Sequence, residues 1–448
     1  MTSPKSTPGS LQETWLARYL KWLPPPALNL VLLFSGRGAQ AGYLAAVDQG
    51  LISVANFLAT LFLARSATPT ELGIYGVGFT SLRLVRSIQE GLCIQPLNTF
   101  GAAQDEDSFR RYATSTSLLQ ILLAIISALG VSLVGWFALR LGNDVAGPTL
   151  IALGPAFLWW QLQEYVRRML YTRGRVLAAA LNTALSNAFR LGIMIWWMRR
   201  DQLDGAASLQ AIALGALVAL LPGLWQTRRS WTLEFENLRQ VWRRNWDFGR
   251  WVMGGSIANW LAVEFYPVLT AGMISFAAAG AYRALQNLVA PVFLLLRATD
   301  TFLTPRAAKA YDEYGQTALR RLVRLAYATT GVPILGLLAL AVLFPNQLLG
   351  LLYGETYLAF SDGILMMAVF YALMYAYWPL QAAFKAARLS RPIFVANLAA
   401  GAAMFTIGIW MISRWGVYGT IGGQALNALI VLLVLGFSWR RLRRGYVD

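Results

Sequence analysis

The stretch DQGLISVANFLATLFLAR, residues 48–65, is long and apolar enough to cross a lipid bilayer as a single helix. Four polar residues interrupt it, namely Gln49, Ser53, Asn56 and Thr60. They are spaced three or four positions apart, so they share one face of the helix. Because lipid cannot satisfy polar side chains, that face must turn toward protein or water. The stretch therefore predicts a membrane helix that lines a polar interior.

The composition of the whole chain is typical of a membrane protein. Of its 448 residues, 57% are hydrophobic and only 13% are charged, and the mean hydropathy is +0.50. A soluble domain carries roughly 25% charged residues. The chain has no histidine and one cysteine, Cys93, which excludes histidine-based catalysis, histidine metal sites and an intramolecular disulfide. No Walker-type phosphate loop is present, so ATP hydrolysis is excluded and no cofactor is expected.

Apolar runs of sufficient length predict an all-α polytopic membrane protein with twelve transmembrane helices. These spans are residues 41–64, 70–94, 113–139, 148–168, 176–198, 206–225, 250–274, 278–302, 323–344, 360–383, 390–412 and 417–438. With the N-terminus in the cytoplasm, 28 of the 38 lysines and arginines fall in cytoplasmic segments and five in outer loops. Cytoplasmic loops retain basic residues, so this split favours cytoplasmic N- and C-termini. The net charge of +17 reflects the same bias, and no nucleic-acid partner is expected.

The polar helix has a second copy later in the chain. In GGSIANWLAVEF, residues 254–265, Ser256 and Asn259 repeat the spacing of Ser53 and Asn56 at an offset of 203. Two further segment pairs agree in the same order, at offsets of 207 and 218. The offsets predict two parallel six-helix bundles around a central cavity. The expected divisions are an interfacial N-terminal segment, an N-lobe, a cytoplasmic linker, a C-lobe and a basic tail, at residues 1–40, 41–225, 226–249, 250–438 and 439–448.

Charged and polar residues inside the predicted spans form the candidate site, because such residues are costly in lipid and usually mark a pathway or a pair. The candidates are Arg83, Arg86, Arg190, Arg283, Arg297, Asn56, Asn259, Gln286, Tyr75 and Tyr282. Guanidinium groups bind phosphate oxygens in bidentate fashion, amides suit sugar hydroxyls, and tyrosine rings stack on sugars. If their faces meet, the cavity suits a polyprenyl pyrophosphate that carries an oligosaccharide.

Three acidic residues, Asp48, Glu90 and Glu264, are candidates to bind a coupling proton or sodium ion. Structural roles compete with the functional ones. The asparagines can join neighbouring helices, Arg83 or Arg86 can pair with Glu90, and Arg297 can extend toward the membrane surface. Helical spacing places Glu264 away from the face of Ser256 and Asn259.

Residues 48–100 and 249–311 together resemble the multidrug/oligosaccharidyl-lipid/polysaccharide exporter superfamily, and within it the polysaccharide transporters of the O-antigen flippase type. The resemblance rests on DQGLISVANFLATLFLAR followed by ELGIYGVGF, and on GSIANWLA, AGAYRALQNLVAPV and LTPRAAKAY. It implies two six-helix lobes and export of lipid-linked oligosaccharides across the bacterial inner membrane by alternating access. It also implies a bilayer environment, glycan polymerase or export proteins as partners, and no enzymatic activity.

Two other functions stay open at this point. A drug/cation antiporter of the same fold requires an acidic cavity in which Asp48, Glu90 and Glu264 converge. A membrane scaffold or enzyme of glycan assembly requires, for catalysis, paired carboxylates that face one cavity.

Overall fold

The computed structural model describes residues 37–102 and 104–443, and these two ranges contain helices and no strand. Most of the predicted N-terminal segment, and residues 444–448 of the predicted tail, lie outside the described residues. Apolar side chains are widely exposed on the helices, as lipid-facing surfaces require. On α5, for example, Leu122, Ile126 and Leu129 are all more than half exposed. The chain is therefore an all-helical, multi-pass membrane protein.

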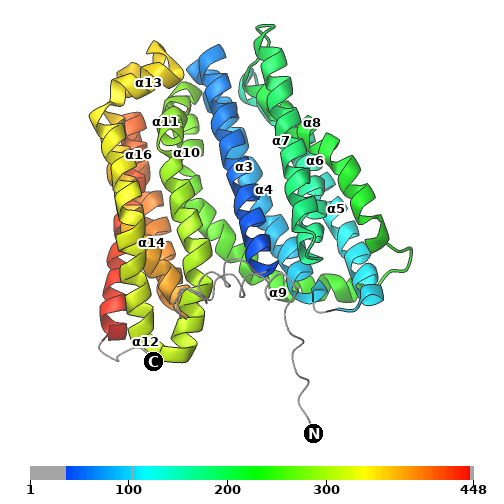
Figure 1. Cartoon of the computed structure of the whole chain (residues 1–448). Coiled ribbons are helices and arrows are strands. Elements are labelled where there is room, and N and C mark those ends of the chain that lie inside the picture. The colour runs from blue at the N-terminus through cyan, green and yellow to red at the C-terminus, as the bar shows by residue number, and fades with distance from the viewer. Residues whose placement is uncertain (1–36, 103, 444–448) are drawn as a thin grey trace, which may run out of the picture.

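The first half of the described chain contains six long helices (Figure 1). They are α3 (Arg37–Ser66), α4 (Pro69–Gln89), α5 (Glu106–Arg140), α6 (Ala146–Thr172), α7 (Val176–Met198) and α8 (Gly205–Thr227). Two π-helical turns, η1 (Glu90–Ile94) and η2 (Leu97–Gly101), extend α4. Short polar residues cap three of the helices. Thr68, Asp105 and Asp204 each accept a backbone N–H from the first turn of the helix that follows.

The second half has more interruptions. A short 3₁₀ turn, η3 (Arg228–Ser230), precedes it. Its elements are α9 (Leu238–Asn259), η4 (Trp260–Glu264), α10 (Tyr266–Met273), α11 (Phe276–Leu288), α12 (Ala290–Leu343), α13 (Pro345–Tyr353), η5 (Glu355–Phe360), α14 (Gly363–Ala386), α15 (Ser390–Ala403), η6 (Met404–Gly408) and α16 (Ile409–Arg443). Glycines with positive φ kink two long helices, Gly315 in α12 (φ 64°) and Gly416 in α16 (φ 55°).

Every predicted span overlaps a helix, with differences in detail. Seven helices are long and apolar enough to cross a membrane by themselves, or eight if α11 and the start of α12, bent by 56°, form one span. Predicted spans such as 70–94 and 250–274 carry several charges, which lowers their hydropathy. The count of twelve in two bundles of six therefore stays a prediction. Helix α9 begins at Leu238, inside the segment 226–249 predicted as the linker, and α13 and η5 lie between α12 and α14.

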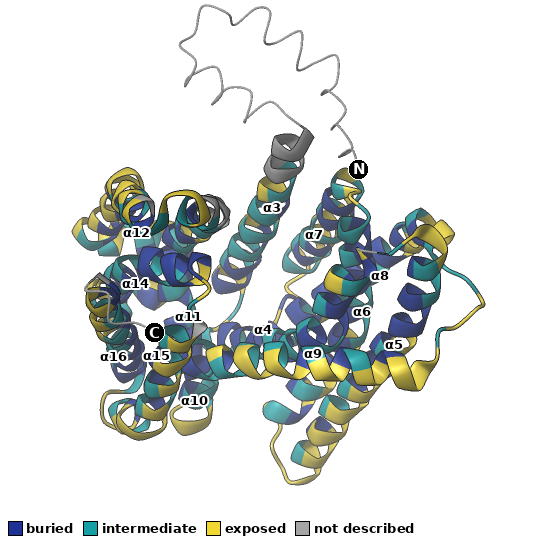
Figure 2. Ribbon diagram, turned by 90° about the horizontal axis from the view of Figure 1, so that it is seen from below, coloured by how far each residue is buried: buried dark blue, intermediate teal, exposed yellow. Residues whose placement is uncertain are grey.

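The helices form two groups with α4 and α9 running between them (Figure 2). In one group α6 packs against α5 and α8, and α7 packs against α8 and α3. In the other group α14 packs against α12 and α16, and α15 packs against α16. We call these the first group and the second group. Helix α9 lies along the lower face of the molecule and leads from the first group into the second (Figures 1 and 2).

The groups meet most closely where α4 crosses α11. A Cβ added to Gly73 would lie 1.8 Å from the Phe276 carbonyl oxygen, and one added to Gly280 would lie 1.9 Å from the Pro69 carbonyl oxygen. The contact is reciprocal, since Gly73 and Gly280 are 207 positions apart in the sequence and so are Pro69 and Phe276. A reciprocal contact of this kind is what a two-fold relation between two copies produces. Glycine is required on both sides because the helix backbones touch.

Candidate functional site

A cavity of about 770 Å³ lies between the two groups of helices. Its walls come from α3, α4, α6, α7, α9, η4, α11 and the first turns of α12. The polar stripe of the opening stretch contributes Gln49, Ser53 and Asn56, and its repeat contributes Ser256 and Asn259. The two polar faces read from the sequence thus line the same space. Thr60 does not reach it, because its hydroxyl donates to the Asn56 carbonyl at 2.9 Å and the residue is fully buried.

Basic side chains dominate the charged lining of the cavity. The lining arginines are Arg83, Arg86, Arg167, Arg168, Arg190, Arg283 and Arg297. The lining carboxylates are Glu90, Glu164 and Glu264. Seven positive charges against three negative ones leave an excess of four positive charges in a membrane-embedded space. Charges taken out of water are stable only when they are paired or solvated, so this excess favours an anionic occupant.

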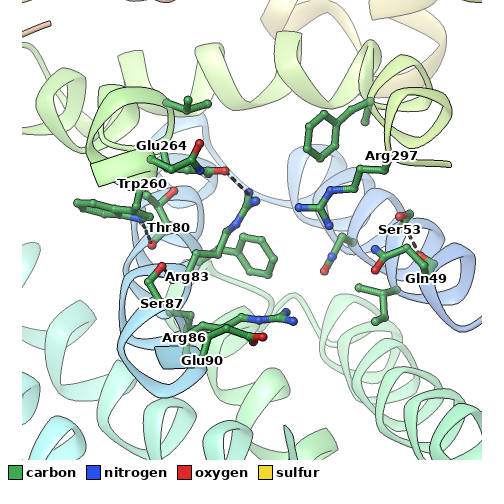
Figure 3. A pocket seen from close by; sticks show the side chains of 18 of the residues that line it. Gln49, Ser53, Thr80, Arg83, Arg86, Ser87, Glu90, Trp260, Glu264 and Arg297 are labelled. Atoms are coloured by element: carbon green, nitrogen blue, oxygen red, sulfur yellow. Dashed lines mark hydrogen bonds and ion pairs between the residues drawn. The ribbon is translucent and has the colours of Figure 1, made fainter. Parts of the chain in front are cut away.

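One ion pair in the cavity joins the two groups of helices. Arg83 Nη2 on α4 lies 2.7 Å from Glu264 Oε1 at the end of η4 (Figure 3). The Arg83 side chain is 32% exposed, so it faces the cavity and its carboxylate partner together. Arg297 points into the same space from the facing wall, with its guanidinium 4.8 Å from the Phe293 ring centroid (Figure 3). Arg297 therefore lines the cavity.

Glu264 reaches the cavity because of the π-helical turn that contains it. Regular helical spacing from Ser256 and Asn259 placed Glu264 on another face. The turn at Trp260–Glu264 holds an extra residue, which rotates the following side chains by about 100° relative to an α-helix. Trp260 holds the turn against α4, since its Nε1 donates to the Thr80 carbonyl at 3.0 Å.

A second charge cluster forms on one wall of the cavity, around Glu164 of α6. Arg167 donates to both Glu164 oxygens at 2.8 Å, Arg168 Nε donates at 2.9 Å, and Arg86 Nη2 lies 3.3 Å away. Arg167 also binds Asp48 Oδ2 at 2.6 Å, and the Tyr171 hydroxyl donates to the same oxygen at 2.6 Å. Arg167 thus bridges two buried carboxylates. Arg86 remains 35% exposed to the cavity.

Arg190 is held without a carboxylate. Its Nη1 donates to Asn56 Oδ1 at 2.9 Å, and its Nη2 donates to the hydroxyl of Tyr75. Its Nε is buried and has no hydrogen-bond partner among the described residues. Within residues 37–102 and 104–443 no acidic side chain pairs with Arg190, although the residue is only 6% exposed. A buried, uncompensated guanidinium that lines a cavity can accept an anion as its partner.

Arg283 is in a similar position on α11. Its Nη1 donates to Gln286 Oε1 at 2.9 Å, and its guanidinium lies 5.3 Å from the Phe79 ring centroid. Its Nε, too, has no hydrogen-bond partner in the described part of the chain. Gln286 in turn donates to the Tyr282 hydroxyl at 3.0 Å, and that hydroxyl donates to Gln424 Oε1 at 2.7 Å. Polar hydrogen bonds therefore orient Arg283 without neutralising it.

Most of the predicted site residues line the cavity, and two do not. Tyr75 is fully buried outside the lining, where it supports Arg190. The Tyr282 side chain borders the cavity but is also fully buried, so neither predicted ring is open to stack on a sugar in this structure. Asp48 lies outside the lining because Arg167 and Tyr171 hold it. Glu90 lines the cavity, but it accepts from Gln95 at 2.9 Å, and neither Arg83 nor Arg86 pairs with it as the sequence suggested.

The candidate residues predicted from the sequence do not include Glu164, Arg167 and Arg168. They lie at the end of the span predicted at 148–168, and α6 continues to Thr172 and carries them on the cavity wall. A usable signal was present, because residues 164, 167 and 168 are spaced i, i+3 and i+4 and therefore share one helix face.

Contacts between the groups also close the end of the molecule opposite α9. Arg65, at the end of α3, donates through Nε to the Leu352 carbonyl at 2.7 Å and through Nη2 to the Leu351 carbonyl, both at the end of α13. Asn287 donates to the Tyr353 hydroxyl at 2.9 Å. Burial raises the pKa of Tyr353 to about 12, so its hydroxyl stays protonated. The cavity is thus bounded on this side by hydrogen bonds to α13 (Figure 1).

Comparisons with solved structures agree with this architecture. The chain is similar to an inward-facing multidrug resistance MATE family transporter of the MOP superfamily, with a TM-score of 0.72, 14% identity, and coverage of 87% of this chain and 94% of that chain. It is also similar to the lipid II flippase MurJ in an inward closed conformation, with a TM-score of 0.69, 12% identity, and coverage of 88% and 87%. A MOP superfamily transporter from Pyrococcus furiosus matches with a TM-score of 0.59, 14% identity, and coverage of 90% and 94%.

The chain therefore shares the fold of these membrane transporters. A family model described as "Polysaccharide biosynthesis protein" matches residues 62–362. The chain belongs to this family, as the resemblance in its sequence indicated. No curated protein sequence matches the chain at a significant level.

Proposed function

We propose that the protein flips a polyprenyl-pyrophosphate-linked oligosaccharide across the inner membrane of a bacterium. The observation that carries this proposal is the excess of guanidinium groups in the cavity, above all Arg190 and Arg283, which have no carboxylate partner in the described ranges. A pyrophosphate offers the paired oxygens that guanidinium forks bind. Family membership adds a link to polysaccharide biosynthesis. The solved flippase of similar fold, MurJ, acts on lipid II.

In the proposed cycle the cavity binds the charged headgroup while the polyprenyl chain stays in the bilayer. The pyrophosphate displaces Glu264 from Arg83 and gains Arg190 and Arg283 as further partners, and the amides of Asn56 and Asn259 bind sugar hydroxyls. Displacing Glu264 breaks the ion pair between the groups of helices. Loss of this pair favours separation of the groups on one side and exposure of the headgroup on the other, which is alternating access.

The driving force we propose is the membrane potential, with or without a coupling ion. A charge that moves outward from a negative interior gains about 2.3 kcal/mol per 100 mV, and a pyrophosphate carries about two charges. Asp48, Glu90 and Glu264 remain our candidates for a coupling proton or sodium ion. The basic lower face, which carries α9, would lie in the cytoplasm together with both termini. Glycan polymerase or export proteins are the expected partners.

The cavity does not offer what a drug/cation antiporter requires. A cationic drug needs carboxylates that are free to face it. Among the described residues Glu264 and Glu164 are paired with arginines, and Asp48 lies outside the cavity. Glu90 is the one remaining carboxylate of the described lining, and it accepts from Gln95, so the three acids do not converge. The multidrug transporters among the structural matches share the fold at about 14% identity, a likeness that shows the fold alone.

The test is transport in proteoliposomes that contain a labelled lipid-linked oligosaccharide. Wild-type protein is compared with Arg83→Ala, Arg283→Ala and the control Arg140→Ala, which removes an exposed arginine beside Trp136. Each charge-assisted hydrogen bond contributes about 1.5–3 kcal/mol, so each cavity variant should slow transport at least about tenfold. The control should keep the wild-type rate. Full rates for both cavity variants would overturn the proposed site.

A further inference from the structure

Helix α9 carries a second polar and aromatic surface that the transport cycle does not use. Its residues Arg239, Arg243, Trp246 and Arg250 are spaced by four, three and four positions, so they share one face. Trp242 lies at the edge of the same face. Trp242 and Trp246 are 45% and 40% exposed, and α9 lies flat along the lower face of the molecule (Figure 2). Tryptophan and arginine on one exposed helix face are typical of the membrane–water interface.

A narrow apolar groove of about 70 Å³ opens beside this face. Its lining includes Leu92 of η1, Leu122 and Ile126 of α5, and Trp242 and Trp246 of α9. Leu122 is 51% and Ile126 is 59% exposed, so the groove borders the lipid-facing surface of α5. Its walls are almost wholly hydrocarbon and aromatic, which suits a hydrocarbon chain and no polar ligand.

The charge beside the groove is positive and accessible. The side chain of Arg243 is 85% exposed, and the nearest acid, Asp247, lies 4.0 Å from its Nε. Arg239 and Arg250 are also exposed, and Arg250 lies 5.5 Å from the Trp251 ring centroid. A weak surface pair at 4.0 Å contributes little, so the arginines of this face remain available to an anion.

The groove is anchored to the first group of helices. Asn245 of α9 donates to the Leu92 carbonyl at 3.2 Å, and the Tyr112 hydroxyl donates to Asn245 Oδ1 at 2.8 Å. Gly249 packs on the backbone of Gly91, where a Cβ would lie 2.1 Å from the carbonyl oxygen. These contacts fix both walls, so the groove is preformed.

We propose that this face binds one anionic phospholipid of the adjacent leaflet, with an acyl chain in the groove and the phosphate on Arg239 and Arg243. The arginines of the face complement the negative charge of the headgroup, and the apolar groove accommodates the acyl chain. A zwitterionic lipid, which carries no net charge, matches only the groove. The proposal does not depend on which cargo the cavity carries.

Lipid binding can be measured by native mass spectrometry of the purified full-length protein in mild detergent. The probes are phosphatidylglycerol and phosphatidylcholine with identical acyl chains. The variants are Arg239→Gln/Arg243→Gln and Leu122→Trp, which fills the mouth of the groove. The matched control is Arg321→Gln/Arg324→Gln, which removes two exposed arginines from α12. All proteins must elute as the wild type does and unfold at the same temperature.

Phosphatidylglycerol should bind wild-type protein more tightly than phosphatidylcholine. Each arginine near the membrane surface contributes about fivefold in affinity, so the α9 variant should bind phosphatidylglycerol on the order of 25-fold more weakly, and the control should not change. Leu122→Trp should also weaken the binding. Equal affinities of wild-type protein for the two lipids, an equal effect of the two arginine variants, or full binding by Leu122→Trp would each overturn the proposal.

Discussion

Replacing Gly73 with alanine should destabilise the contact between the two groups of helices. The new Cβ would lie 1.8 Å from the backbone oxygen of Phe276, whereas ordinary contact begins at 3.4 Å, so the helices must separate by about 1.6 Å. A backbone atom cannot rotate away, so the cost should reach the upper end of the 1–3 kcal/mol typical of overpacking. Alanine recovers about 1 kcal/mol through helix propensity. We therefore expect Gly73→Ala to lower the free energy of unfolding by about 2 kcal/mol, measured by chemical denaturation in detergent.

Two further variants make this expectation specific to the crossing. Gly272→Ala in α10 adds the same methyl group where no atom lies within 4 Å, so it should not destabilise the protein and should gain about 1 kcal/mol through helix propensity. Gly73→Ala/Gly280→Ala should cost less than the sum of the two single changes, because one separation of the helices relieves both clashes. If Gly73→Ala matched Gly272→Ala, or if the double variant were strictly additive, the close crossing would not hold the groups together.

Three other perturbations test the site. Glu264→Gln frees Arg83 from its ion pair, so the protein should bind inorganic pyrophosphate about tenfold more tightly in calorimetry. An unchanged affinity would contradict the competition between the Glu264 carboxylate and the anion for Arg83. Arg167→Met leaves two buried carboxylates without their shared partner and should cost about 3–5 kcal/mol in denaturant unfolding; a loss below 1 kcal/mol would refute this role. Arg65→Gln removes the hydrogen bonds to α13. In this background a Ser53→Cys thiol should react about tenfold faster with an impermeant maleimide added on the α13 side of the membrane. Equal reaction rates with and without Arg65→Gln would show that Arg65 does not close that side.

The bounds and the polar faces of the helices were predicted well where hydropathy and regular helical spacing alone decide them. The span predicted at 176–198 coincides with α7, and the stripe of Gln49, Ser53 and Asn56 faces the cavity as its spacing implied. Where local backbone geometry departs from the α-helix, the prediction failed. Hydropathy does not reveal a π-helical turn, so the rotation that brings Glu264 to the cavity was not foreseen. Helix α13 was read as a loop because it is short.

The residue types of the site could be predicted from the sequence, but their partners could not. An arginine inside a span indicates a functional or paired group, and all five candidate arginines line the cavity. Which carboxylate pairs with which arginine depends on contacts between helices far apart in the chain. Arg83 pairs with a residue 181 positions away, and Arg167 with one 119 positions away. Helical spacing describes only neighbours within one helix, so it favoured Glu90 as the partner of Arg83 or Arg86.

The pair of tyrosines at matching places in the two halves has an evolutionary consequence. A chain made by joining two copies of one ancestral unit starts with two identical cavity walls. A cargo with two different ends would then fit the cavity equally well in either orientation. Tyr75 and Tyr282 lie at matching places in the two halves, yet Arg190 donates to the first and the amides of Gln286 and Gln424 bind the second. Each half therefore holds its guanidinium by a different route, directly through Tyr75 for Arg190 and through Gln286 for Arg283, so the two halves no longer offer a cargo equivalent positions.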